Sequence, residues 1–512
     1  MSAPSQGGSA HHLHGGMLFG AIFLLALANF MAVLDLTIVN VAVPHIAGSL
    51  AVSPNEGTWV ITSYAVAEAI TVPLTGWLAA RFGAVRVFVV AAACFGLFSL
   101  LCGFAPSLSM LVVFRVLQGF SGGPLMPISQ TLLLRVTPPN RAQMALGLQT
   151  MTTILAPIAG PLIGGSLTDS VGWPWAFYIN VPIAIVVAFA VWRLFRAHET
   201  ETVNRPVDYV GLGLLILWIG ALQILLDNGQ EKDWFASPFI VSLAVIAAIG
   251  FIAFLIWELT DEHPIVDLSV FRSRTFSVMA AAMAFTFGAF FATVVLIPLW
   301  LQTNMGYTAT WAGDVMAFQG VLGVMVAPVA ALAISRVDPR LVMSIGLSIL
   351  AAVTFWRTSF THDVTYWQLV LPQLLTGIGI PLFFVPLMGL SVAAVPPAQT
   401  ASAAGLVNFI RTMSGAFGTA LVTTVWDQTS TNVRVNLAGR LHQPQDTLAT
   451  LQAHGQSSAQ ATQSLSDIVQ SQAVMVATNQ VFLMLAVIIA GVAVCVWLSP
   501  KPKGVVSLAA AH

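Results

Sequence analysis

The chain has 512 residues, of which 57% are hydrophobic and only 8% are charged, and its formal net charge is −1. Soluble domains carry about 25% charged residues, so this composition excludes an ordinary soluble protein and indicates an integral membrane protein. A nearly neutral chain gives no reason to expect a nucleic-acid partner. The three cysteines lie in or beside apolar segments without metal-ligand spacing, so neither a disulfide framework nor a cysteine metal site is expected.

The first sixteen residues lie ahead of the first apolar segment and are rich in Ser, Gly and His. They lack the basic segment and the cleavage site of a signal peptide, so we expect residues 1–16 to be a disordered cytoplasmic tail and the first apolar segment to be a retained helix. His11, His12 and His14 have the chemistry of metal ligands. A disordered tail is the simpler interpretation, and no metal site is expected.

Fourteen apolar segments are long enough to cross a bilayer, whose core of about 30 Å requires roughly 20 residues of helix. Irregular backbone cannot face lipid, so each segment is predicted to be a helix. The predicted fold class is therefore an all-α integral membrane protein. The predicted spans are residues 17–43, 57–79, 86–104, 107–134, 142–168, 175–195, 208–226, 236–257, 274–301, 308–334, 341–359, 366–392, 402–426 and 474–498.

Lys and Arg residues favour the cytoplasmic side of a membrane protein. With the N-terminus inside, thirteen of the 19 Lys and Arg residues fall in cytoplasmic segments, and three fall outside. We therefore predict that both termini, including the tail 499–512, are cytoplasmic. The other three arginines lie within spans or at their ends: Arg115, Arg357 and Arg411.

The longest segment between two spans covers residues 427–473 and is predicted to project from the outer face. It is mostly polar and rich in Gln, Ser, Thr and Ala. The spacing of its few Val and Leu residues allows an amphipathic helix that would serve as a docking element. A flexible, solvated loop is equally compatible with the sequence.

The sequence contains an internal repeat. Two Pro-Pro stretches, one leading to Gly147 and the other to Gly405, stand 258 residues apart, and the same offset separates Gly119 from Gly377. Spans 1–6 and spans 9–14 therefore read as two copies of one six-helix unit. Parallel six-helix halves are typical of secondary transporters, whose binding site lies between the halves near the middle of the bilayer.

The repeat divides the chain into predicted domains. Residues 17–195 form the N-terminal six-helix half, and residues 274–498 form the C-terminal half, which contains the long outer segment. Residues 196–273 supply two inserted helices with their loops.

Asp35 is the most informative residue, because it lies inside the first apolar segment. A carboxylate at that depth is costly and marks a functional site by default. Arg115, within the fourth span, needs a partner in the same low-dielectric environment, and Asp35 is the obvious candidate. Arg115, Gln118 and Gly122 share one helical face. We predict an Asp35–Arg115 pair, either as part of a proton-transfer site or as a structural ion pair.

The second span carries a polar stripe formed by Tyr64, Glu68, Thr71 and Thr75, at the spacing of one helical face. Glu68 is predicted to lie near the middle of the membrane and to face a cavity. It takes part either in proton coupling or cation binding, or in neutral hydrogen-bonded packing. Asp314, near the start of the tenth span, is either a second acidic contact or an outer-end cap. No histidine lies in mid-span, so carboxylates must carry any proton relay.

Four stretches resemble motifs of the major facilitator superfamily. Gly76 to Arg86 resembles motif A, Leu111 to Gly123 resembles motif B, and Ala156 to Gly165 resembles the antiporter motif C. Leu34 to Pro44 closely resembles the signature of the fourteen-span drug:proton antiporters, and among these the chain is most similar to EmrB-type multidrug pumps. The resemblance implies the major facilitator fold, with two six-helix halves plus two inserted helices.

The resemblance also assigns gating to motifs A and C. Ala80 stands where motif A usually has an aspartate, so a charge relay centred on that position is not expected. In motif C, proline kinks the helix and glycines four residues apart allow close helix packing. The residues expected to act in gating are Gly76, Arg81, Gly83, Arg86, Gly160, Pro161, Gly164 and Gly165.

The function implied by the resemblance is proton-driven export of amphipathic drugs and toxic compounds, with no cofactor besides the proton gradient. Asp35, Glu68 and Arg115 are expected to couple protons to transport. An adaptable substrate cavity needs aromatic and Met side chains with a few polar groups. The expected lining residues are Phe30, Met31, Tyr64, Gln118, Met151, Phe290, Phe291, Asp314 and Phe384.

An EmrB-like pump implies a bacterial inner-membrane location, a periplasmic adaptor and an outer-membrane channel. The alternative within transport is a dedicated exporter of one endogenous metabolite, such as a fatty acid or siderophore. Uptake is less favoured, because motif C is typical of exporters. An enzyme is not expected, since the sequence has no Walker loop, no H-E-x-x-H and no G-x-S-x-G.

Overall fold

The computed structural model describes residues 13–138, 141–203, 206–262, 264–334, 336–396, 399–439, 444–454 and 456–501. Within these ranges every regular element is a helix, which confirms the all-α fold class. All fourteen predicted spans coincide with helices. Eleven stretches of the described chain are long and apolar enough to cross a membrane, and α3, α7 and α16 are not among them.

The described part of the N-terminal half contains nine α-helices, because the spans at residues 107–134 and 175–195 are each divided and the short helix α2 precedes the second span. The first division falls at Gly123 and Pro124, where the chain bends between α5 and α6. The helices are α1 (Gly15–Ser49), α2 (Pro54–Gly57), α3 (Trp59–Phe82), α4 (Ala84–Gly103), α5 (Leu108–Gly122), α6 (Leu125–Val136), α7 (Ala142–Ser170), α8 (Trp175–Tyr178) and α9 (Asn180–Phe195).

The inserted pair and the C-terminal half follow. Several of their helices begin at a side chain that accepts a hydrogen bond from the first turn, as Asp208 does for α10 and Asp338 for α14. The helices are α10 (Tyr209–Asn228), α11 (Pro238–Thr260), α12 (Arg274–Asn304), α13 (Ala309–Ile334), α14 (Pro339–Trp356), α15 (Tyr366–Ala393), α16 (Thr400–Gly439), α17 (Pro444–Ala453) and α18 (Ser458–Cys495).

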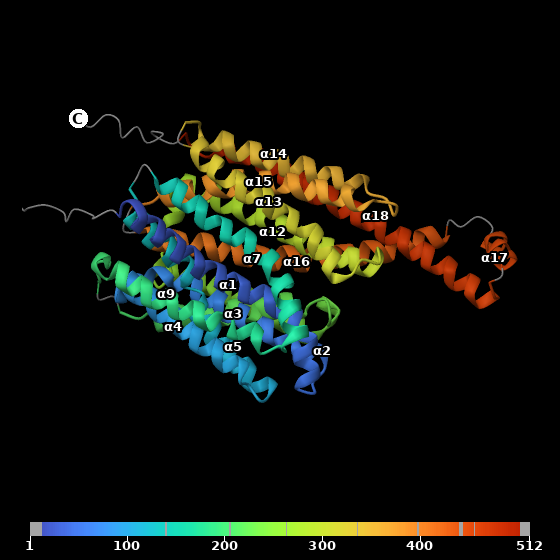
Figure 1. The fold of residues 1–512 in the computed structure, drawn as a ribbon, viewed down its shortest axis with the longest axis horizontal. Helices are drawn as coiled ribbons and strands as arrows, with labels where there is room; N and C mark the ends of the chain where they lie inside the picture. Colours follow the sequence, from blue (N-terminus) through green and yellow to red (C-terminus); the bar gives the residue numbers. More distant parts are fainter. Residues whose placement is uncertain are drawn as a thin grey trace, which may run out of the picture.

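The two halves lie against each other along α7 and α16, which run between them in Figure 1. α16 packs on α3, where Ser402 fills the space beside Gly76 and the backbone of Val72 lies beside Gly405. α7 packs on α13, where Gly147 faces Ala331. Glycine at these points lets helices from different halves approach closely.

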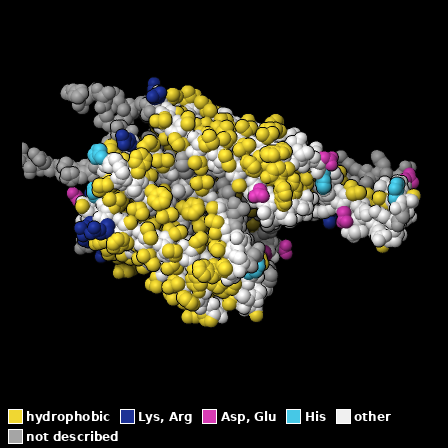
Figure 2. Space-filling model, viewed as in Figure 1, with side chains coloured by type: hydrophobic (Ala, Val, Ile, Leu, Met, Phe, Trp, Pro, Cys, Tyr) yellow, Lys and Arg dark blue, Asp and Glu magenta, His cyan; other side chains and the backbone are white. Residues whose placement is uncertain are grey.

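The surface matches a membrane setting. A broad apolar belt covers the flank of the bundle, and most of the visible Lys and Arg side chains gather at the end where the described chain begins and finishes (Figure 2). Large apolar side chains such as Phe23, Phe189 and Ile249 are among the most exposed, as lipid contact allows. The orientation derived from Lys and Arg stays a prediction.

The long segment at residues 427–473 is helical over most of its described residues, which agrees with the helical alternative. α16 has 40 residues, which at 1.5 Å per residue is about 60 Å, roughly twice the bilayer core. α16 and α18 project as a hairpin beyond the bundle and carry α17 at the tip (Figure 1). The Trp426 indole donates to the Thr478 hydroxyl at 2.9 Å and ties the two helices together.

Candidate functional site

Asp35 is completely buried and is held by three side chains from two other helices. The guanidinium of Arg115 donates from Nη1 to Oδ2 at 2.5 Å, and Gln118 and Asn180 donate to Oδ1 at 3.0 and 2.7 Å. The predicted pair is therefore present, and Gln118 contacts the carboxylate directly. A buried carboxylate with this many donors is fully compensated while it is ionised.

The arginine of this pair is fixed from its other side. Its Nε donates to the Val60 carbonyl at 2.9 Å, and its guanidinium carbon lies 4.2 Å from the centroid of the Tyr64 ring. Nη2 of Arg115 and the hydroxyl of Tyr64 are both buried without a hydrogen-bond partner. Unpaired buried donors are costly, so this site has spare hydrogen-bonding capacity for a water or a rearranged carboxyl group.

The antiporter-like stretch of α7 packs directly against the Asp35 turn of α1. A Cβ atom on Gly160 would collide with Thr37, and a Cβ atom on Gly164 would lie 2.8 Å from the side chain of Ile38. The Thr37 hydroxyl donates to the Ala156 carbonyl at 3.3 Å. Because α7 also packs on α13 and α15, it connects the carboxylate to the interface between the halves.

Glu68 is a second carboxylate, and it interacts electrostatically with Asp35 and Arg115. It is partly buried on α3 and interacts electrostatically with Arg411 of α16, in the other half. Arg411 contacts the Met126 sulfur at 3.3 Å, lies over the Phe287 ring, and has a buried Nε without a partner. The two carboxylates therefore occupy different places, one inside the N-terminal half and the other where the halves meet.

A small polar pocket, with a cavity volume of about 10 Å³, lies between the halves beside Arg411. Asn408 of α16 donates to Gln130 of α6 at 2.9 Å and bridges the halves across it. Several amide atoms here are buried without a hydrogen-bond partner, on Asn29, Gln149 and Asn408. Such atoms need a water or ligand. The lining residues are Asn29, Met126, Gln130, Gln149, Phe384, Met388, Asn408 and Arg411.

Comparison with known proteins identifies the family. Residues 25–419 match the model of the Major Facilitator Superfamily. The chain belongs to this superfamily. It is 41% identical to the Multidrug export protein EmrB of Haemophilus influenzae, over 96% of this chain and 98% of that protein. It is also 41% identical to the Fatty acid resistance protein FarB of Neisseria gonorrhoeae, over 96% and 97%.

Within the superfamily the chain is therefore an EmrB-type member. The human organic anion transporter MFSD10 (TETRAN) has the same fold, with a TM-score of 0.58 and 13% sequence identity over 93% of this chain and 100% of that one. At 13% sequence identity, this structural similarity supports the fold and nothing about function.

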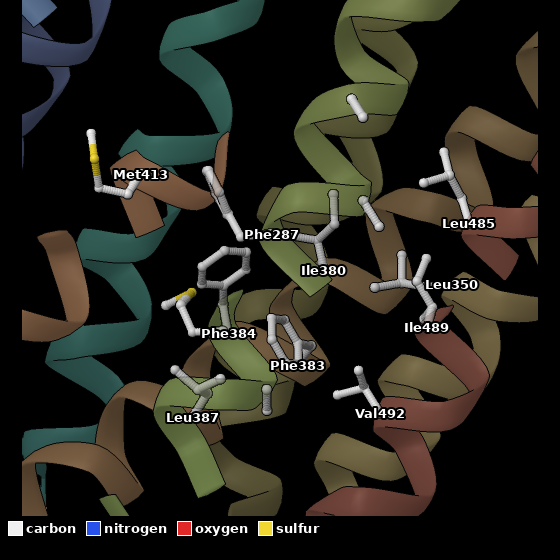
Figure 3. Packing of buried hydrophobic residues seen from close by; sticks show 14 of the residues in the cluster. Phe287, Leu350, Ile380, Phe383, Phe384, Leu387, Met413, Leu485, Ile489 and Val492 are labelled. Carbon is white, nitrogen blue, oxygen red and sulfur yellow. The ribbon is translucent and has the colours of Figure 1, made fainter. Parts of the chain in front are cut away.

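The predicted cavity residues of this superfamily member lie in several places. Phe384 lines the central pocket and packs edge-on against Phe287, with Met413 nearby (Figure 3). Phe291 stacks on Phe287. Phe290 lines a different pocket, inside the C-terminal half.

Of the other predicted cavity residues whose side chains the structure describes, none lines the central pocket. Met31 is buried in the core of the N-terminal half, and Phe30 is half-buried on the same helix. Tyr64 and Gln118 belong to the Asp35 network. Asp314 is half-buried near Tyr366. The side chains of Met151 and Pro161 lie outside the described part of α7.

The motif A loop contacts an acidic residue, Glu199, that lies outside the motif and was not predicted from it. Gly83 has a φ of +89°, which favours glycine, and lies beside the carboxylate of Glu199. That carboxylate accepts hydrogen bonds from the backbone N–H groups of Val85 and Arg86 at 2.9 and 3.1 Å. Glu199 therefore caps α4 within a motif that has Ala80 where the family motif has its aspartate.

Replacing Glu199 by Ala is expected to lower the stability of the purified protein by about 0.5–2 kcal/mol, the usual cost of losing a helix cap. Thermal unfolding in detergent measures this. Glu201 is exposed in the same loop, and Glu201→Ala serves as the control. Equal unfolding temperatures for both variants would contradict the capping role.

Sequence reasoning also missed Asn29, Gln130, Gln149, Asn180 and Asn408. Each is a neutral amide in an apolar helix, and each is almost completely buried. An amide side chain within a membrane-spanning segment is a weaker indication of a functional site than a charged side chain, because an amide costs less to bury. A search for amides on the inward faces of spans 1, 4, 5, 6 and 13 would have found them.

Proposed function

We propose that this EmrB-type transporter exports amphipathic compounds across the bacterial inner membrane in exchange for protons, by alternating access. The observation that carries the proposal is the buried Asp35 carboxylate, compensated by Arg115 and placed on a turn of α1 that packs against α7 through Thr37 and Ile38. Protonation neutralises the carboxylate and weakens its ion pair with Arg115. The same turn of α1 contacts α7, the helix that packs against the C-terminal half. Proton binding and movement of the halves are thereby linked.

The central pocket is the proposed substrate site. It combines aromatic and Met side chains with amide groups and one cation, a composition that suits compounds with an apolar body and a polar head. Its place between the halves is where a transporter of this architecture exposes substrate to either side of the membrane in turn.

Transport in proteoliposomes tests this function. We expect the purified protein to move a lipophilic drug only when a proton gradient is imposed, with no requirement for ATP. Purified protein should show no ATPase turnover. Drug movement that depends on ATP, or that ignores the proton gradient, would contradict the proposal.

A dedicated exporter of a fatty acid or similar endogenous acid is the second candidate. Two observations favour it: the similarity to the fatty acid resistance protein FarB, and the single cation, Arg411, that lines the central pocket. A guanidinium there would pair with a carboxylate head group.

Arg411→Gln is expected to weaken the apparent affinity for an anionic substrate such as decanoate by about tenfold, because a charged hydrogen bond contributes roughly 1.5–3 kcal/mol. A neutral drug should lose less. Arg411→Lys keeps the charge and should retain most of the affinity for decanoate. An equal loss for both substrates in Arg411→Gln would contradict a role of Arg411 in charge recognition.

The helical hairpin of α16, α17 and α18 is the proposed docking element for a periplasmic adaptor, which would connect the transporter to an outer-membrane channel. The length of the hairpin supports this, since it extends well beyond a bilayer core (Figure 1). On the predicted orientation it projects into the periplasm. Deleting residues 440–456 should abolish adaptor binding while leaving transport in proteoliposomes intact.

A further inference from the structure

A second, small pocket, with a cavity volume of about 20 Å³, lies inside the C-terminal half and away from the central pocket. Its apolar side includes Leu350 and Ile489, which lie close together in Figure 3. Its polar side is formed by seven side chains from α12, α13, α14, α15 and the turn that follows α14: Thr286, Thr293, Gln319, Thr354, Arg357, Gln373 and Thr376.

Arg357 gives this pocket an uncompensated positive charge. Its side chain is only 2% exposed. Nη2 donates to Thr376 at 2.8 Å and to Gln373 at 3.2 Å, and the guanidinium lies 6.0 Å from the Phe482 ring centroid. Both hydrogen-bond partners are neutral, and no carboxylate among the described residues forms an ion pair with Arg357.

The internal repeat relates this pocket to the Asp35 network. The offset of 258 residues carries Arg115 onto Gln373 and Gln118 onto Thr376, the two partners of Arg357. The same offset carries Asp35 onto Thr293, which lines the pocket. The offset carries Ser99 onto Arg357, so the C-terminal half supplies its cation from a different position and has a threonine where the N-terminal half has its carboxylate.

A guanidinium keeps its proton even in a protein interior, and a buried charge is stable only when it is paired. Two further polar atoms in the pocket lack hydrogen-bond partners, the Thr286 hydroxyl and the Gln319 amide oxygen. The assignment of oxygen and nitrogen in an amide can be reversed, so both side chains can donate. The pocket thus has a cation and spare donors, which is the chemistry of an anion site.

We propose that this pocket binds a small monovalent anion, either a free halide or the carboxylate group of a short organic acid, paired with Arg357 and hydrogen-bonded by Thr286 and Gln319. The anion takes the place of the carboxylate that Asp35 supplies in the other half. The site is independent of the central pocket, so its occupancy can be tested without transport.

Thermal unfolding of the full-length protein in detergent tests the site. Chloride, bromide and acetate are each titrated against gluconate at constant ionic strength. We expect the unfolding temperature of the wild type to rise with the bound anion and to saturate, while Arg357→Gln shows no saturable rise. Thr286→Val should shift the midpoint several-fold to higher concentration. Arg434→Gln, on the projecting hairpin, is the matched control and should behave as the wild type.

Crystals soaked in bromide give a direct reading, with anomalous density expected next to Arg357. Saturation by halides but not by acetate identifies a free ion, and competition between bromide and acetate identifies carboxylate chemistry. The proposal is overturned if no anion stabilises the wild type in a saturable manner, or if Arg357→Gln responds as the wild type does. If Arg357→Gln does not fold, an unchanged midpoint in Thr286→Val together with absent bromide density overturns it.

Discussion

Asp35→Asn is expected to abolish gradient-driven efflux. Asparagine cannot carry the proton, and the substitution leaves the Arg115 charge buried and uncompensated, since the remaining partners Gln118 and Val60 are neutral. Breaking a buried ion pair by removing one partner costs about 3–5 kcal/mol. The variant should therefore also unfold at a lower temperature than the wild type.

Efflux in proteoliposomes and thermal unfolding in detergent measure the two effects separately. Asp467→Asn, in an exposed position of the hairpin, controls for loss of an acid elsewhere and should match the wild type. Asp35→Glu restores the proton-binding group and should recover part of the efflux. Normal gradient-driven efflux in Asp35→Asn would show that the exchanged proton is carried by another group.

Gly160→Ala and Gly164→Ala are expected to impair transport severely, because each added methyl group enters space already filled by α1. The Cβ atoms would meet Thr37 and Ile38. Forcing an extra methyl group into packed surroundings costs about 1–3 kcal/mol, and here the displaced turn is the one that holds Asp35. We expect both variants to transport at a small fraction of the wild-type rate.

Gly165→Ala is the matched control from the same motif. A Cβ atom at Gly165 has no neighbour within 4 Å, so this variant should transport at the wild-type rate. Initial efflux rates at equal amounts of reconstituted protein give the comparison. If all three alanine variants behave alike, the motif acts through helix flexibility and not through contact with α1.

Much of the fold could be predicted from the sequence, because hydrophobic length alone defines membrane helices. All fourteen predicted spans are helical, and the repeat marks the two six-helix units. The Asp35–Arg115 contact was predictable for a similar reason, since two opposite charges in a membrane have few partners available. The bend at Gly123 and Pro124 was missed because the apolar pattern continues across it.

The sequence could not show which groups from different helices meet. Glu68 and Arg411 are more than 300 residues apart in the sequence and interact electrostatically only because α3 and α16 pack together across the halves. Glu199 follows α9 in the sequence and caps α4, more than 100 residues earlier. The absence of an aspartate from motif A therefore did not show that Glu199 supplies a carboxylate to this loop. Arg357 lies near the end of the predicted span 341–359, where charged residues are common, so its burial could not be predicted. Its burial depends on how α14, α15 and α18 pack.

The most direct test of proton exchange at Asp35 uses a pH-sensitive dye inside proteoliposomes. An outward drug gradient is imposed without a proton gradient, and internal pH is recorded for the wild type and for Asp35→Asn. We predict that drug movement drives protons in the opposite direction in the wild type, and that Asp35→Asn gives no proton movement. Drug movement in the wild type without any change of internal pH would contradict proton antiport. An equal pH change in Asp35→Asn would remove Asp35 from the proton pathway.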